Sequence, residues 1–181
     1  DMYEVEGVDR AHMKLPPGHN KLIESIAKIK RDVVVVLSNG SPVEMPWVND
    51  VPAVIEGYLG GQAGAGALAD ILYGVVNPSG KLAETFPYTL EDTPTYHHFP
   101  GGPITVEYRE SIYVGYRYYD TAQVDVLFPF GHGLSYTTFA YRDLKLTQSG
   151  DTVSATFKVK NSGALAGQEI VQLYVRDVGA T

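Results

Sequence analysis

An amphipathic helix pattern runs directly into a block of valines near the start of this chain. Residues 20–30 read NKLIESIAKIK, and their apolar positions recur at the spacing of one helix face. The residues that follow, RDVVVVLS, form a β-branched run without alternation, the pattern of a central strand buried on both faces. A helix followed at once by such a strand is typical of an α/β fold with a mostly parallel sheet. The apolar helix face consists of Leu22, Ile23, Ile26 and Ile29.

Later segments continue this alternation to about residue 86. AVIEGY (53–58) predicts a second short strand, and GAGALADILYG (64–74) predicts a helix. A turn at NPSG then leads to a third expected strand over 81–86. The inward side chains of the second helix are expected to be Leu68, Ile71 and Leu72.

Residues 87–135 are rich in aromatic residues, glycine and proline and predict a long ordered loop. Within this part of the chain, YRESIYVGYRYYD (108–120) is dense in tyrosine. LFPFGHGLSYTTF (127–139), which overlaps the end of this loop, is a compact aromatic segment. Neither pattern predicts a helix.

The tail of the chain has a different pattern. YRDLKLTQSG, DTVSATFKVKNSG and GQEIVQLYVRD are three alternating runs separated by Ser-Gly or Asn-Ser-Gly turns, which indicates an antiparallel β-sandwich. Three strands are fewer than the usual seven or so of such a sandwich. The sequence therefore predicts a layered α/β sandwich domain over residues 1–139, in which helices flank a mostly parallel sheet. Residues 140–181 are predicted to be only the first strands of a second domain.

Composition excludes several classes of function. The chain has 181 residues and a net charge of −7 spread without acidic or basic blocks, which argues against nucleic acid or an anionic membrane as a partner. It contains no cysteine, so a thiolate nucleophile and a cysteine-based zinc site are excluded. No apolar run approaches the ~20 residues of a membrane span. The composition leaves the compartment open.

Two patterns suggest a cofactor or a metal only weakly. GAGALA (64–69) fits the GxGxxA dinucleotide motif, but its first glycine does not directly follow the strand, so we expect no cofactor. We interpret these small residues as allowing a helix to pack closely against a sheet. The histidines show no HxxxH or HExxH spacing, so we expect no metal site. They are His12, His19, His97, His98 and His132, the last of which we expect to fill a hydrogen-bonded turn.

The loop after the valine strand is also a weak site candidate. Ser41 lacks the GxSxG context of a serine hydrolase. Asn39-Gly40-Ser41 is a glycosylation sequon, but it follows a strand that we expect to be buried, so we expect it to be unused.

The opening residues EVEGVDR concentrate charge in Glu4, Glu6, Asp9 and Arg10. General acid/base chemistry requires a carboxyl group with a raised pKa or a pair that shares one site. The residues alone favour a solvated surface loop, because short charged clusters usually lie on the surface, and leave a catalytic loop as the second interpretation.

The whole chain carries a more specific signal. Five segments, EGVDRAHMKLP, VVVVLSNGSPVEMPW, GGQAGAGALADILYGVVNPSGKLAETFP, YRESIYVGYRYYD and LFPFGHGLSYTTF, resemble the C-terminal half of glycoside hydrolase family 3, the β-glucosidase and β-xylosidase family. They occur in the order and at the spacings of that family over residues 4–139. The tail resembles the first strands of the family's fibronectin type III-like domain.

The resemblance implies a role for the opening carboxylates. In that family, an N-terminal (β/α)8 barrel carries an aspartate nucleophile, and the α/β sandwich domain donates the acid/base glutamate from an E-G-Y-D-R motif. Residues 6–10 match this motif, with Val8 in place of its tyrosine, so the resemblance places the acid/base role on Glu6. Glu4 is the second candidate, because it lies two residues away and points the same way if the segment is extended.

The function implied is a retaining, exo-acting β-glycosidase that acts on terminal β-linked sugars of oligosaccharides or glycosides, with β-glucosidase as the first choice. β-Xylosidase and arabinofuranosidase are alternatives within the family. The nucleophile motif is absent from these residues, so we expect the chain alone to be inactive without the barrel domain or chain. A non-catalytic carbohydrate-binding or scaffolding module is the alternative from another class, with tyrosines over 108–119 and 136–141 as stacking platforms.

Overall fold

The computed structural model describes residues 4–5 and 7–179. They form two compact units. One contains the described residues up to Gly66 together with Leu82–His132, and the other contains Ala67–Lys81 and the described residues from Gly133 onward. The boundary that the sequence predicts at residue 139 stays a prediction.

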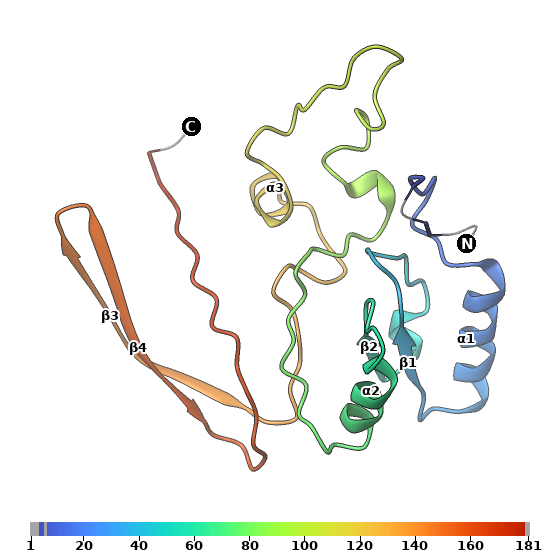
Figure 1. The fold of residues 1–181 in the computed structure, drawn as a ribbon, viewed down its shortest axis with the longest axis horizontal. Helices are drawn as coiled ribbons and strands as arrows, with labels where there is room; N and C mark the ends of the chain where they lie inside the picture. The colour runs from blue at the N-terminus through green and yellow to red at the C-terminus, as the bar shows by residue number, and fades with distance from the viewer. Residues whose placement is uncertain (1–3, 6, 180–181) are drawn as a thin grey trace. The chain divides into compact units, whose positions relative to one another are not determined.

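The first unit is built on two parallel strands and the helix that precedes them (Figure 1). The strands pair in parallel from Val34 opposite Ala53 to Leu37 opposite Glu56. Proline in the first turn of the helix fits its start, because the missing N–H would have no partner there. The elements are α1 (Pro17–Ile29), β1 (Val34–Leu37), a 3-10 turn η1 (Val48–Asp50) and β2 (Ala53–Glu56).

The core of this unit lies on one face of β1. Val35 and Leu37 are buried, whereas Val34 and Val36 are 45% and 39% exposed. The expectation of a central strand buried on both faces is therefore wrong for the described residues, since β1 pairs only with β2 and packs through alternate side chains. Trp47, fully buried, donates from Nε1 to Asn20 Oδ1 on α1 at 2.9 Å. The buried cluster comprises Val35, Leu37, Val43, Met45, Trp47, Val51 and Phe86.

The expected strand over 81–86 is replaced by irregular pairing with residues 127–132. Phe86 and Phe128 form an isolated antiparallel bridge and an edge-to-face ring contact with centroids 6.5 Å apart. Leu82 N donates to His132 O, and Gly131 N donates to Leu82 O, both at 2.8 Å. The His132 ring stacks on Phe128, and its N–H donates to Pro129 O, which agrees with the expected turn.

The long loop contains two short helical elements, a 3-10 turn η2 (Leu90–Asp92) and α3 (Tyr116–Ala122). The expectation of no helix in the tyrosine-rich segment is therefore wrong. Gly115 precedes α3 with a φ of +55°, and Gln123 ends it in a left-handed conformation. Tyr119 is the buried residue of this helix. One tyrosine therefore packs inward, and the neighbouring tyrosines hide this pattern in the sequence.

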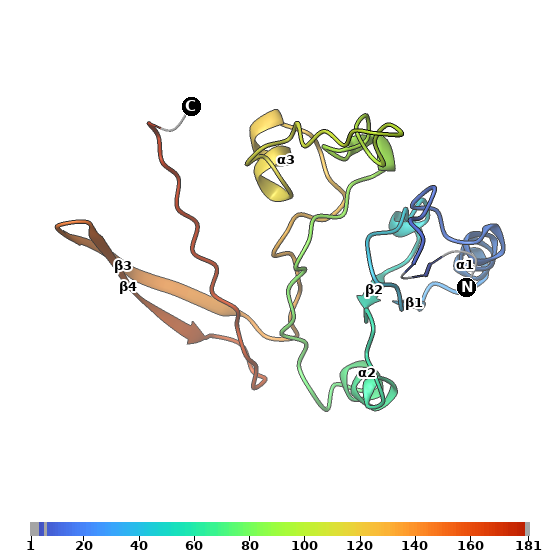
Figure 2. The ribbon, with the colours of Figure 1, turned by 45° about the horizontal axis from the view of Figure 1, so that its top comes forward.

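The second unit contains most of α2 (Gly64–Leu72) and an antiparallel hairpin of β3 (Phe139–Ser149) and β4 (Thr152–Asn161). Figures 1 and 2 show the two strands of this hairpin side by side. A register shift interrupts the pairing between Arg142 and Lys145. The third alternating run, over 167–177, is not a strand, because no described segment pairs with it.

On α2, Leu68 and Ile71 are half-buried as expected, but Leu72 is exposed. Taken together, the parallel sheet with its helices and the small antiparallel sheet confirm the predicted fold class. None of the described helices is long and apolar enough to cross a membrane.

Candidate active site

Two turns meet at the carboxyl ends of β1 and β2. Ser38 Oγ, just after β1, donates to Tyr58 O at 3.1 Å, and Gly57 N, just after β2, donates to Leu37 O at 2.9 Å. Ligand sites of open α/β sheets form at this edge, where the loops leave the strands. The candidate site therefore begins at these two turns.

Asn39 connects the two turns from a position that is only 6% exposed. Its Nδ2 donates to Ser41 O at 2.8 Å and to Glu56 Oε2 at 3.2 Å. The other oxygen of Glu56 accepts the Tyr58 N–H at 2.9 Å. The sequon amide is thus buried and engaged in hydrogen bonds, and the expectation that it is not glycosylated stays a prediction.

Two half-buried glutamates come together beneath these turns. Burial raises the pKa of Glu56, and the Glu84 carboxylate adds to this rise, while hydrogen bonds from Tyr58 and Asn39 oppose it. Burial also raises the pKa of Glu84, against the opposing influence of Tyr58 and Arg10. Both carboxyl groups therefore hold their protons more tightly than exposed glutamates do.

Tyr58 lies between these carboxyl groups. Burial, and then the negative charge of Glu84, raise the pKa of its phenol well above the ordinary range. The hydroxyl is buried and has no hydrogen bond of normal length and angle with the residues that the structure describes, although Glu84 is close enough to influence it. The Tyr58 hydroxyl is therefore close to Glu84 without forming a hydrogen bond to it.

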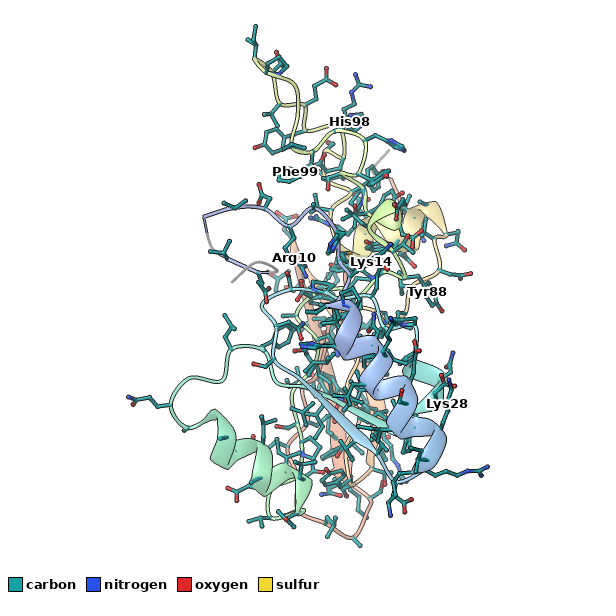
Figure 3. All side chains as sticks on the ribbon, turned by 90° about the vertical axis from the view of Figure 1, so that its right-hand side faces the viewer. Arg10, Lys14, Lys28, Tyr88, His98 and Phe99 are labelled. Atoms are coloured by element: carbon teal, nitrogen blue, oxygen red, sulfur yellow. The ribbon has the colours of Figure 1, made fainter. Side chains whose placement is uncertain are left out.

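The opening segment is attached to the same edge at two points. Glu4 Oε1 accepts the Gly40 N–H at 2.8 Å and a longer contact of 3.5 Å from Ser41 Oγ. Arg10 Nη2 donates to Ser41 Oγ at 2.6 Å and to Pro42 O at 2.9 Å. Figure 3 shows Arg10 on the segment that leads to α1.

The predicted acid/base residue, Glu6, lies outside the described residues. Its described neighbours Val5 and Val8 form an isolated antiparallel bridge, and both are exposed, as is Gly7. The runner-up, Glu4, is half-buried and bonded to the backbone of the turn after β1. Among the described residues of the charged cluster, Asp9 is exposed, whereas Glu4 and Arg10 are attached to the turn after β1.

Sequence reasoning missed Glu56, Glu84 and Tyr58 as members of this site. The sequence did carry a signal for Glu56, because this charged residue ends an otherwise apolar strand. The strand pairs with β1, which Asn39 follows. Glu84 carried no such signal, because its approach to the sheet edge depends on the irregular pairing of residues 82–86.

The glycine-rich GAGALA segment, which resembles a dinucleotide motif, does not pack in the structure as we expected. A Cβ added at Gly64 or Gly66 would meet nothing within 4 Å, so the expected close packing of the GAGALA helix is wrong at these two positions. Gly60 does need its small size, since a Cβ there would lie 2.9 Å from Gly64 Cα.

His97 and His98 are adjacent on the long loop, where Figure 3 labels His98. Over residues 4–5 and 7–179, no group of three or more ligating side chains is placed to hold a metal ion.

Fold and site define an α/β domain whose loops bring carboxylates to the carboxyl edge of a parallel sheet. The sequence matches the family described as "Glycosyl hydrolase family 3 C-terminal domain" over residues 1–136. The chain therefore belongs to this family, as its motifs led us to expect.

Curated relatives support this membership. The chain is 57% identical over 182 residues to thermostable beta-glucosidase B of Acetivibrio thermocellus, covering 98% of this chain and 24% of that protein. It is 48% identical to probable beta-glucosidase I of Aspergillus niger, covering 96% of this chain and 22% of that protein. The chain thus spans about a quarter of the length of these relatives.

Solved structures show the same similarity in three dimensions. Beta-glucosidase from Kluyveromyces marxianus in complex with glucose superposes with a TM-score of 0.84 at 42% identity, covering 87% of this chain and 19% of that one. Beta-glucosidase 3B from Thermotoga neapolitana in complex with glucose gives 0.82 at 39% identity, covering 91% and 24%.

Proposed function

We propose that this chain is the C-terminal part of a retaining, exo-acting β-glucosidase that removes terminal β-linked glucose from oligosaccharides or glycosides. The observation that carries the proposal is its 57% identity, over almost its whole length, to a thermostable beta-glucosidase. In this proposal, an N-terminal (β/α)8 barrel supplies the rest of the active site. Residues 140–181 begin a fibronectin type III-like domain, a role that the long β3–β4 hairpin supports.

The proposed chemistry needs two carboxyl groups about 5–5.5 Å apart. An aspartate of the barrel attacks the anomeric carbon, while Glu6 gives a proton to the departing glycosidic oxygen. Glu6 then takes a proton from the water that hydrolyses the glycosyl-enzyme. Its place in the 6–10 motif supports this role, as does the attachment of the described residues Glu4 and Arg10 at the carboxyl edge of the sheet.

The contacts of Glu4 support Glu6 as the better candidate. Glu4 Oε1 accepts a backbone N–H from Gly40 at 2.8 Å, so this oxygen is already engaged with the turn after β1. A general acid must instead be able to approach the oxygen that it protonates. Glu4 therefore suits an anchoring role.

The test uses the parent enzyme that contains this chain. Glu6→Gln should lower kcat/KM by about 10²-fold or more on cellobiose, whose leaving group needs a proton. The loss should be small on 2,4-dinitrophenyl β-glucoside, whose leaving group departs without one. Glu4→Gln tests the second candidate, and an equal loss of kcat/KM on both substrates for Glu6→Gln would rule out the proton-donor role.

The sugar and the stereochemistry can be checked on the same enzyme. NMR of the first product should show β-glucose, which is retention, and kcat/KM should be higher on the aryl β-glucoside than on the matching β-xyloside or α-arabinofuranoside. First-formed α-glucose would contradict the two-step mechanism.

A further inference from the structure

We propose that Arg10 is a positioning residue, which together with Ser41 holds the catalytic loop in the orientation that proton transfer requires. This inference rests on the acid/base role proposed above for Glu6. It concerns the turn of residues 39–42, which we call the anchor turn, and the described residues on either side of Glu6.

Both flanks of the loop meet on the anchor turn. The N-terminal flank binds through Glu4 Oε1 to Gly40 N at 2.8 Å. The C-terminal flank binds through Arg10 Nη2 to Pro42 O at 2.9 Å. The described residues Glu4 and Arg10, on either side of Glu6, are therefore held by backbone groups of the same turn.

Ser41 connects the two flanks through one hydroxyl. Its Oγ accepts a hydrogen bond from Arg10 Nη2 at 2.6 Å and lies 3.5 Å from Glu4 Oε1, toward which it can donate its proton. A hydroxyl has one donor and can accept at the same time, so the direction Arg10 to Ser41 to Glu4 is chemically consistent. Arg10 on one flank and Glu4 on the other thus contact the same Ser41 hydroxyl.

The anchor turn is itself fixed to the sheet. Asn39 Nδ2 donates both to Ser41 O, inside the turn, and to Glu56 Oε2, at the end of β2. Beyond Arg10, Glu44 N donates to Met13 O at 2.9 Å, and Met13 is buried. The anchor turn that holds the loop is consequently attached to the ends of β1 and β2.

The arrangement has a direct consequence for catalysis. A general acid must come within about 2.6–3.2 Å of the oxygen that it protonates. A displacement of about 1 Å costs on the order of 10²-fold in rate. Removing the Arg10 contacts frees one flank of the loop without replacing a carboxyl group, so the loss should fall selectively on the proton-transfer step.

The experiment compares Arg10→Met, Arg10→Lys and Ser41→Ala in the parent enzyme, with Arg31→Met as the control at an exposed arginine just after α1. For Arg10→Met we expect kcat/KM on cellobiose to fall by about 10- to 100-fold. On 2,4-dinitrophenyl β-glucoside, kcat/KM should stay within about threefold, because its leaving group needs no proton. Arg10→Lys should recover part of the cellobiose activity, and Arg31→Met should change neither value.

A second readout separates positioning from general damage. Azide attacks a glycosyl-enzyme without base assistance, so it should raise kcat of Arg10→Met on the dinitrophenyl substrate, as it should for Glu6→Ala. Equal losses of kcat/KM on both substrates, or no loss, would overturn the positioning role. Ser41→Ala keeps every charge and should give the same selective pattern at smaller size if Arg10→Met does not fold.

The failure of the two proposals can be told apart. If Glu6→Gln shows no dependence on the leaving group, the acid/base assignment is wrong. If Glu6→Gln shows that dependence while Arg10→Met and Ser41→Ala do not, Glu6 keeps its role and only the positioning inference is overturned.

Discussion

Asn39 Nδ2 lies 3.2 Å from Glu56 Oε2, and this contact joins the turns that follow the two parallel strands. Asn39 is 6% exposed, and a second half-buried carboxyl group, that of Glu84, is close enough to Glu56 to raise its pKa. An uncharged donor at position 39 therefore lowers the cost of holding two acidic groups at one sheet edge.

Asn39→Asp should destabilise the protein strongly at neutral pH. The substitution keeps the shape of the side chain but replaces a donor by a third negative charge beside Glu56 and Glu84. We expect a loss of about 2–4 kcal/mol in the free energy of unfolding at pH 7, shrinking toward pH 4.5 as the carboxyl groups take up protons. Chemical unfolding of the parent enzyme at both pH values measures this.

The control for this prediction is Asn49→Asp, at an exposed position on η1. It should change the free energy of unfolding by less than about 0.5 kcal/mol. Equal losses for the two variants, or a loss at position 39 that does not depend on pH, would contradict a charge-based cause.

Much of the first unit could be predicted from local pattern. The 3.6-residue periodicity of residues 20–30 located α1, and the valine block located β1. The same block gave the wrong burial, because four valines in a row cannot show which face is covered. The missed helix α3 has the same kind of cause, since Tyr119 packs inward while its sequence neighbours are also tyrosines.

The candidate site could be predicted only in part, because it is assembled from distant segments. The charged cluster of Glu4 and Arg10 is visible in the sequence, but its partners lie 31 or more positions away in the anchor turn. Nothing in the residue types around Ser41 signals that contact. The pairing of Glu56 with Glu84 similarly depends on tertiary placement.

Glu84→Gln should make stability less sensitive to rising pH. Burial raises the pKa of Glu84 and of Glu56 above the ordinary value of 4.5, so the folded state holds these protons more tightly than the unfolded chain. Their contribution is complete below pH 4.5 and is lost as pH rises through the raised values. Glutamine at position 84 removes the contribution of the Glu84 carboxyl group to this pH dependence. It also lowers the pKa of Glu56, because the negative charge of Glu84 is gone.

Melting temperatures of the parent enzyme and the variant, measured from pH 4 to pH 8, test this prediction. The wild type should lose more stability over that range than Glu84→Gln does. Asp151→Asn, at the exposed tip of the β3–β4 hairpin, should follow the wild-type profile. A variant profile at position 84 as steep as that of the wild type would show that Glu84 is not a source of the pH dependence.

Asn20→Leu should weaken the attachment of α1 to the core. It removes the acceptor of the Trp47 Nε1–H, which lies 2.9 Å away, and the indole has no exposed surface through which to find water. Leaving a buried donor unpaired costs about 1–3 kcal/mol.

A double-mutant cycle with Trp47→Phe isolates this hydrogen bond, since phenylalanine has no donor to leave unpaired. In the Trp47→Phe background, Asn20→Leu should cost much less than in the wild type. Additive losses of free energy in the double variant would mean that the hydrogen bond contributes nothing.

The isolated 181-residue chain should bind no cello-oligosaccharide and release no glucose from an aryl β-glucoside. Several tyrosines that could stack on sugars already contact the chain itself: the Tyr116 ring lies 5.1 Å from Phe130, and the Tyr141 ring stacks on Phe157 at 6.3 Å. Tyr136 is tied through its hydroxyl, which donates to Ile71 O at 3.0 Å. Titration calorimetry with cellotetraose, with the parent enzyme as the positive control, tests this expectation. Binding by the chain alone, without any release of glucose, would favour a carbohydrate-binding module over a fragment of a catalytic centre.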